Sequence, residues 1–115
     1  MKKTSYLVSR FSKSRQAKGL EPGLVSFAIH VLVGEHVAEH GHREWAKLDV
    51  DRATRNLTTN GYVAPAMVDV LTAAWMGFMD WLAGRGRLAR PDAERLNTAI
   101  ETTSATLRDA TRAAG

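Results

Sequence analysis

The longest apolar segment of the chain covers residues 64–83 and contains two of the three tryptophans. Large apolar side chains recur in it at helical spacings of three and four residues: Val68, Leu71, Trp75, Phe78 and Leu82. Pro65 suits the first turn of a helix, and Gly84 suits the position just after its end. Apolar residues also cover most of the remaining circumference, so we predict a buried central helix that the other segments pack around.

Two acids interrupt this segment. Asp69 and Asp80 leave only the ten residues 70–79 free of charge, whereas a membrane span needs about 20 apolar residues. We therefore expect a core helix and no membrane partner. The acids lie eleven positions apart, so they share one stripe of the helix. The favoured interpretation is a solvated edge, and the alternative is that both acids bind basic groups of another segment.

Periodicity and capping residues predict four further helices, with Asp49 or Asp51 as the cap of the third. They cover about residues 4–18, 22–40, 49–59 and 91–113. Residues 24–33 also alternate as a buried strand would, at Val25, Phe27, Ile29, Val31 and Val33. The prediction is an all-α fold of about five helices packed around the Trp-rich helix. The alternative is an α+β fold whose N-terminal β-hairpin pairs residues 6–11 with 24–33.

The last predicted helix carries a heptad-like seam. It consists of Ala93, Leu96, Ile100, Thr103, Leu107, Ala110 and Ala114. Only three of these side chains are large and apolar, so we expect the seam to pack on the central helix within one chain. A homodimer through this seam is the alternative, and replacing Leu107 with Asp would break it.

The positive charge is concentrated at the N-terminus. Residues 1–20 hold six basic side chains and no acid, whereas residues 21–115 hold ten basic and twelve acidic side chains. We therefore divide the chain into a basic, mobile segment 1–20 and a helical domain 21–115. A basic segment on a slightly acidic body is typical of proteins that bind nucleic acid or an acidic protein surface. The candidate partner- or phosphate-binding residues are Lys2, Lys3, Arg10, Lys13, Arg15, Lys18 and, in the loop after the central helix, Arg85, Arg87 and Arg90. Tyr6 and Phe11 interleave with the basic residues, and we interpret both as core side chains rather than stacking platforms.

All four histidines lie between His30 and His42. His36 and His40 are four residues apart and share a helix face, and the chain can turn at Gly41 to bring His42 near. The sequence thus offers a site for a divalent transition metal at His36, His40 and His42. The alternative, which we favour, is a solvated helix end without a cofactor.

No catalytic signature is present. The absence of cysteine excludes disulfides, thiolate metal sites and cysteine nucleophiles, and it fits a reducing, cytoplasmic compartment. The segment GRGRLAR at 84–90 follows a predicted helix and lacks the Lys-Ser/Thr pair of a phosphate-binding loop. A helix-turn-helix is excluded because the recognition helix would carry acids and no base-reading side chain.

These observations favour a small non-enzymatic protein that binds a macromolecular partner stoichiometrically, as a regulator, adaptor or inhibitor. Its Gly, Ala and Arg usage is typical of bacterial or phage proteins. One alternative is a nucleic-acid-associated protein that contacts phosphates through its basic N-terminus. The other is a metal-binding protein that uses the histidine cluster.

Overall fold

The computed structural model describes residues 3–60 and 65–114, and this part of the chain is helical without a strand. Its elements are α1 (Lys3–Ser12), the short 3-10 helix η1 (Arg15–Ala17), α2 (Pro22–His40), the short 3-10 helix η2 (Trp45–Lys47), α3 (Val50–Asn60), α4 (Pro65–Gly84) and α5 (Arg90–Ala114). The all-α prediction of about five helices is confirmed. The β-hairpin alternative is wrong, because residues 6–11 lie in α1 and residues 24–33 lie in α2.

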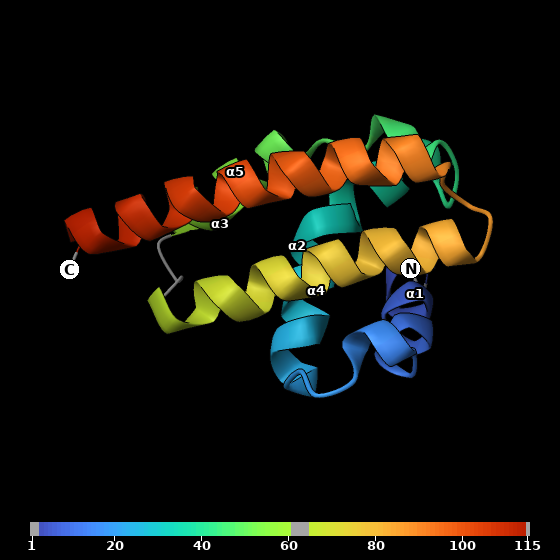
Figure 1. Cartoon of the computed structure of the whole chain (residues 1–115), viewed down its shortest axis with the longest axis horizontal. Coiled ribbons are helices and arrows are strands. Elements are labelled where there is room, and N and C mark those ends of the chain that lie inside the picture. The colour runs from blue at the N-terminus through green and yellow to red at the C-terminus, as the bar shows by residue number, and fades with distance from the viewer. Residues whose placement is uncertain (1–2, 61–64, 115) are drawn as a thin grey trace.

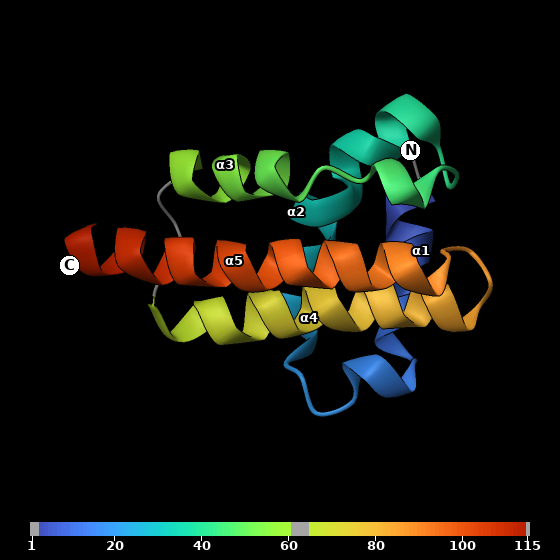
Figure 2. The same ribbon diagram turned by 45° about the horizontal axis from the view of Figure 1, so that its top comes forward.

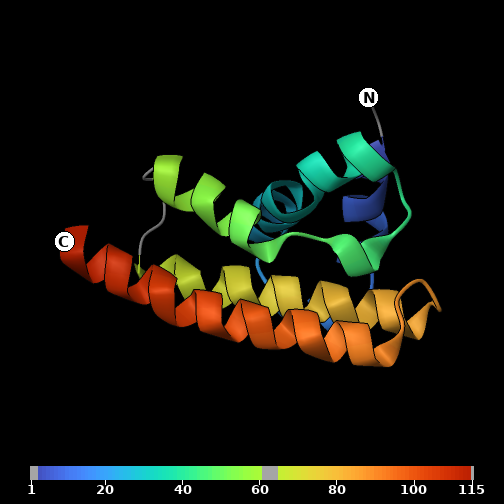
Figure 3. The ribbon, with the colours of Figure 1, turned by 90° about the horizontal axis from the view of Figure 1, so that it is seen from above.

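The helices form two layers. The long helices α4 and α5 lie side by side and antiparallel (Figures 1 and 2). Helices α1, α2 and α3 lie on one side of this pair, and α2 crosses it so steeply that it is seen almost end-on in Figure 3. The molecule extends over 40 × 26 × 26 Å.

Helix α4 is the centre of the fold, as its apolar pattern predicts. The five periodic side chains are all buried: Val68, Leu71, Trp75, Phe78 and Leu82. The indole N–H of Trp75 donates to the main-chain oxygen of Ala28 in α2 at 2.8 Å, which satisfies its buried polar atom. By length and composition alone, Ala66–Gly84 passes as a membrane span, but half of that stretch is buried inside the fold. Such a match is weak evidence, because the core helix of a soluble protein meets the same criterion.

Helix α2 starts and ends where the local sequence predicts. The carboxylate of Glu21 accepts a hydrogen bond from the Leu24 N–H at 2.6 Å, and Pro22 occupies the first turn. Gly41 ends the helix with φ +66°, a conformation that favours glycine. The alternation of residues 24–33 does not decide burial, since Phe27 is 38% exposed whereas Ala28 is buried. In α3, Asp49 is the N-cap and accepts from the Arg52 N–H at 3.0 Å.

Residues 3–20 are an integral part of the core. The ring of Phe11 is fully buried and packs edge-on against Phe78 and Trp81, with centroid distances of 5.4 and 5.7 Å. Leu7 and Val8 are buried beside it. The separation that we expected between a mobile segment 1–20 and a domain 21–115 is therefore not present in the described residues. The charges of this segment lie on the outside of a packed helix.

The first helix is shorter than the predicted range 4–18. It ends at Ser12, and the Ser14 hydroxyl then donates to the main-chain oxygen of Phe11 at 2.6 Å. This bond competes with continuation of the helix, and the chain turns into η1. Gly19, at φ +87°, completes the turn toward α2.

Helix α5 packs its seam on α4 and α3 within the chain. The seam side chains in the described part are buried: Ala93, Leu96, Ile100, Thr103 and Leu107. The side chains of Ala110 and Ala114 lie outside the described part of the chain. This confirms packing within one chain for the described part of the seam, and the homodimer stays a prediction. Leu107 is buried, so a charge at this position would disrupt the core of the single chain.

The two acids of α4 bind basic groups of another segment, which is the interpretation that we treated as the alternative. Asp69 pairs with Arg108 of α5, while Asp80 pairs with Arg90 at 3.4 Å and accepts from the Asn97 amide at 3.3 Å. Both acids nevertheless stay solvated, with side chains 72% and 48% exposed. Pairs this exposed contribute at most about 1 kcal/mol each, so they orient α5 more than they stabilise it.

Candidate anion-binding site

Three segments that are far apart in the sequence meet at one end of the molecule. They are α1, the turn between α2 and η2, and the loop between α4 and α5 (Figure 3). A smaller hollow of about 80 Å³ lies among them. It is lined by Tyr6, Leu7, Arg10, His42, Trp45, Trp81, Leu82, Arg85 and Arg87. A larger hollow of about 550 Å³ shares two of these residues. It is lined by His40, Gly41, His42, Arg43 and Arg87.

We call the two hollows together the arginine cleft, after Arg10, Arg43, Arg85 and Arg87. No Asp or Glu lines either hollow. Within the described part of the chain, none of these four arginines makes an ion pair with a carboxylate. The cleft is therefore a concentration of positive charge without an internal counter-charge.

The end of α4 places two of the arginines. The N–H of Arg85 donates to the Trp81 oxygen at 3.1 Å, and the N–H of Arg87 donates to the Leu82 oxygen at 2.9 Å. Gly86 lies between them at φ +72°, so the chain reverses within a single residue. The guanidinium of Arg85 lies 5.0 Å from the centroid of the Trp81 ring, a cation–π contact that restricts its motion.

Helix α1 adds a matching pair one turn apart. The guanidinium of Arg10 lies 5.8 Å from the centroid of the Tyr6 ring. Phe11 is a core side chain, as we predicted, but Tyr6 is not, because it is 57% exposed. An exposed aromatic ring thus stands beside a cation at the edge of the smaller hollow.

His42 contributes an unsatisfied atom. Its Nε2 is buried and has no hydrogen-bond partner in the described part of the molecule. The same residue lines both hollows. A buried polar atom without a partner costs free energy, so the fold holds this imidazole at the expense of a hydrogen bond.

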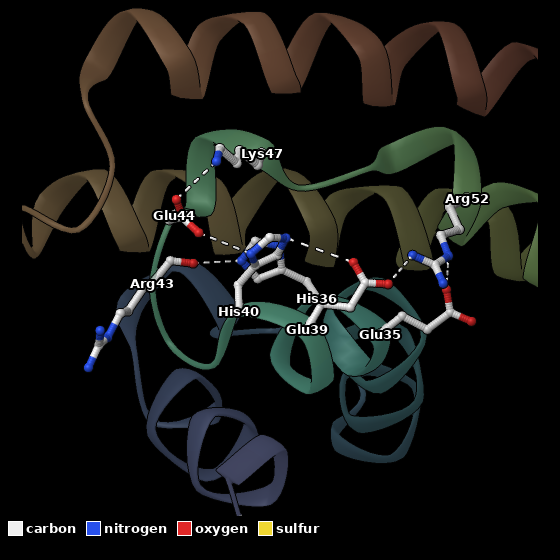
Figure 4. Close-up of polar contacts among 8 residues, drawn as sticks. All are labelled: Glu35, His36, Glu39, His40, Arg43, Glu44, Lys47 and Arg52. Atoms are coloured by element: carbon white, nitrogen blue, oxygen red, sulfur yellow. Dashed lines mark hydrogen bonds and ion pairs between the residues drawn. The ribbon is translucent and has the colours of Figure 1, made fainter.

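An ion-pair network lies next to the cleft and joins α2 to η2 and α3 (Figure 4). Arg52 of α3 binds Glu35 and also Glu39, the latter at 2.7 Å. Glu44 binds His40 and Lys47, each at 3.0 Å. The hydrogen bond from Arg52 lowers the pKa of Glu39, and the hydrogen bond from Lys47 lowers the pKa of Glu44. Each acid of this network thus has a partner within the chain, and the Arg43 side chain points away from them (Figure 4).

His36 is a packing residue. Its ring stacks on Trp45 with a centroid distance of 4.6 Å and an angle of 20°. Its Nε2–H donates to the main-chain oxygen of Arg43 at 2.7 Å, which holds the turn that follows α2. Burial lowers the pKa of His36, so its neutral form is favoured in the fold.

The predicted metal site is not assembled. The rings of His36 and His40 are 4.8 Å apart, but Nε2 of His36 is occupied by the Arg43 oxygen and His40 lies between Glu39 and Glu44. Among the described residues, no group of three or more His, Cys, Asp or Glu side chains is placed to hold a metal ion. Helical spacing brought two imidazoles together, but hydrogen bonds and ion pairs assign them structural roles.

Of the predicted phosphate-binding residues, the structure brings Arg10, Arg85 and Arg87 together. The others that can be placed line neither hollow: Lys13, Arg15, Lys18 and Arg90. Lys2 lies outside the described residues, as does the side chain of Lys3. Sequence reasoning missed Arg43, and it assigned His42 to a metal. The sequence indicated a turn at Gly41, but it did not show which segment this turn would face.

No family model, curated protein or solved structure matches the chain, so its function is inferred from its own geometry.

Proposed function

We propose that this protein acts by stoichiometric binding to an anionic macromolecule, as a regulator, adaptor or inhibitor, and that the arginine cleft is the contact surface. One observation carries the proposal. Arg10 of α1 and Arg85 and Arg87 of the α4–α5 loop line the same hollow, and no carboxylate lines it. A fold that gathers like charges from separate segments without a counter-ion has a surface suited to an external anion.

Three arginines outside the cleft support this interpretation by contrast. Arg52, Arg90 and Arg95 each pair with a carboxylate of the chain itself. Their charges are therefore already neutralised within the protein. The arginines of the cleft retain their binding capacity for a partner.

The dimensions of the cleft favour a macromolecule over a small substrate. Pockets for small molecules have volumes of about 300–1,000 Å³ and mainly apolar walls. The smaller hollow, at about 80 Å³, takes a single anionic group. The larger hollow has the volume but no apolar side chain among its lining residues. Both hollows together suit the repeated charges of a polymer or of an acidic protein face.

The test is a titration of the full-length protein with fluorescently labelled anionic polymers at low and moderate salt. The variant Arg85→Ala/Arg87→Ala removes two charges from the cleft. The variant Lys13→Ala/Lys18→Ala removes two charges from exposed positions that line neither hollow. We expect the arginine variant to bind at least about tenfold more weakly and to lose about one unit of salt-dependence slope for each contact removed. Equal losses in both variants, or no binding at low salt, would contradict the proposal.

A further inference from the structure

We infer that the anionic partner of the cleft is a single-stranded nucleic acid, with one phosphate in the smaller hollow and a neighbouring base stacked on Tyr6. This inference rests on the proposed function and names the chemical class of the partner.

The smaller hollow has the size and donors for a phosphate group. Its volume of about 80 Å³ is several times what one water molecule needs, about 10–15 Å³ by the same measure. Arg10, Arg85 and Arg87 line it, and a guanidinium offers a planar pair of N–H donors that matches two phosphate oxygens. His42 lines the same hollow beside these arginines.

Tyr6 is the residue that favours a nucleic acid over an acidic protein as the partner. The ring is 57% exposed at the rim of the same hollow, with Arg10 above it. Bases stack on exposed aromatic rings and on guanidinium planes without regard to sequence. A carboxylate alone would make no use of this ring, whereas a nucleotide presents a phosphate and a base together. The combination of a phosphate-sized hollow with an exposed tyrosine therefore favours a nucleic acid.

The geometry favours a single strand over a duplex. Stacking on Tyr6 requires an unpaired base, and in a duplex the bases are held inside the stack. The smaller hollow draws on α1, the turn after α2, η2, the end of α4 and the α4–α5 loop rather than on one projecting helix that could enter a groove. We therefore expect binding through phosphates and stacking, with little sequence preference.

The experiment compares four labelled probes by fluorescence anisotropy with the full-length protein. They are an oligothymidylate strand, an abasic strand of the same length and charge, a duplex of the same length and a polyglutamate peptide. We expect the oligothymidylate strand to bind at least about tenfold more tightly than the abasic strand or the duplex. Tyr6→Leu should abolish this preference, whereas Tyr6→Phe should retain it because the ring remains.

The outcomes separate this inference from the proposed function. Equal affinity for the oligothymidylate and abasic strands, or a Tyr6→Leu variant that keeps the preference, overturns the inference. Preferred binding of polyglutamate also overturns it. In each of these cases the proposed function stands if Arg85→Ala/Arg87→Ala weakens the binding that is observed. If that variant has no effect on any probe, both the inference and the proposed function fail. Far-UV circular dichroism of each variant establishes that it is folded.

Discussion

Trp45 connects the core to the polar end of the molecule. Its indole stacks on His36 and lies edge-on to Phe78 of α4, with centroids 5.8 Å apart. The same side chain is buried and lines the smaller hollow of the arginine cleft. The position of the cleft is thus set by core packing, and the binding surface inherits the rigidity of the core around it.

The buried imidazole of His36 gives a testable pH dependence. Burial lowers its pKa below the ordinary value of 6.5 for histidine. The unfolded chain therefore binds a proton there that the folded chain does not, and stability falls as the pH drops below about 6.5. Above that pH this contribution is complete and constant. For one such group, the free energy of unfolding changes by at most about 1.4 kcal/mol per pH unit.

His36→Gln serves as the comparison, because glutamine keeps an N–H for the Arg43 oxygen but does not titrate. Urea denaturation from pH 5 to 8 should show a smaller loss of stability in the variant below about pH 6.5. Two parallel curves over that range would mean that His36 makes no contribution to the pH dependence.

At the scale of the element, the fold depends on how closely η1 approaches α4. A Cβ at Gly77 of α4 would lie 3.2 Å from the main-chain oxygen of Gln16. No atom lies within 4 Å of a Cβ placed at Gly34 of α2. Both residues are inside helices, so they differ in surroundings rather than in backbone conformation.

Alanine substitutions at these two glycines should therefore have different effects. Gly34→Ala should stabilise the protein by about 0.5–1 kcal/mol, because alanine restricts the unfolded chain and favours the helix. Gly77→Ala should receive the same stabilisation from the unfolded chain and the helix, but the main chain of η1 must move away from the added methyl group. We therefore expect the stability of this variant to be unchanged or lower. The measurement is the urea midpoint of each variant. An equal gain at both positions would show that η1 does not restrict position 77.

The whole molecule consists of two layers that meet around α4, and the N-terminal segment belongs to the buried part. Leu7, Val8 and Phe11 of α1 and Ala17 of η1 all enter the core. The charges that suggested a separate binding segment are thus carried by a helix that the fold needs. Charge substitutions in the full chain, rather than truncations, are the appropriate test of binding.

Deletion of residues 1–19 should prevent stable folding. Loss of one buried phenylalanine side chain alone costs about 3–5 kcal/mol, against a total stability of about 5–15 kcal/mol for a typical domain. We expect the truncated chain to lose its cooperative thermal transition in circular dichroism. The Lys13→Ala/Lys18→Ala variant, which removes charge but no core side chain, should keep it. A truncated chain that melts cooperatively near the full-length temperature would show that α1 is dispensable.

The positions of the elements could be predicted from the sequence because the interactions that define them are local. The helix predicted over 22–40 is α2, with Pro22 in its first turn and Gly41 at its end. Asp49 caps α3, and the five periodic side chains of α4, Val68, Leu71, Trp75, Phe78 and Leu82, are buried as their helical period requires. Each of these features depends on residues within one or two turns of each other.

The candidate site could not be predicted, since it depends on which distant segments meet. Arg10 and Arg87 line one hollow only because α1 and the α4–α5 loop pack at the same end of the fold. His36 and His40 share a helix face, as their spacing predicts, but bonds to the Arg43 oxygen and to Glu44 decided that they do not form a metal site. Local periodicity places side chains along and around a helix, whereas contacts between helices decide which of them are left for a partner.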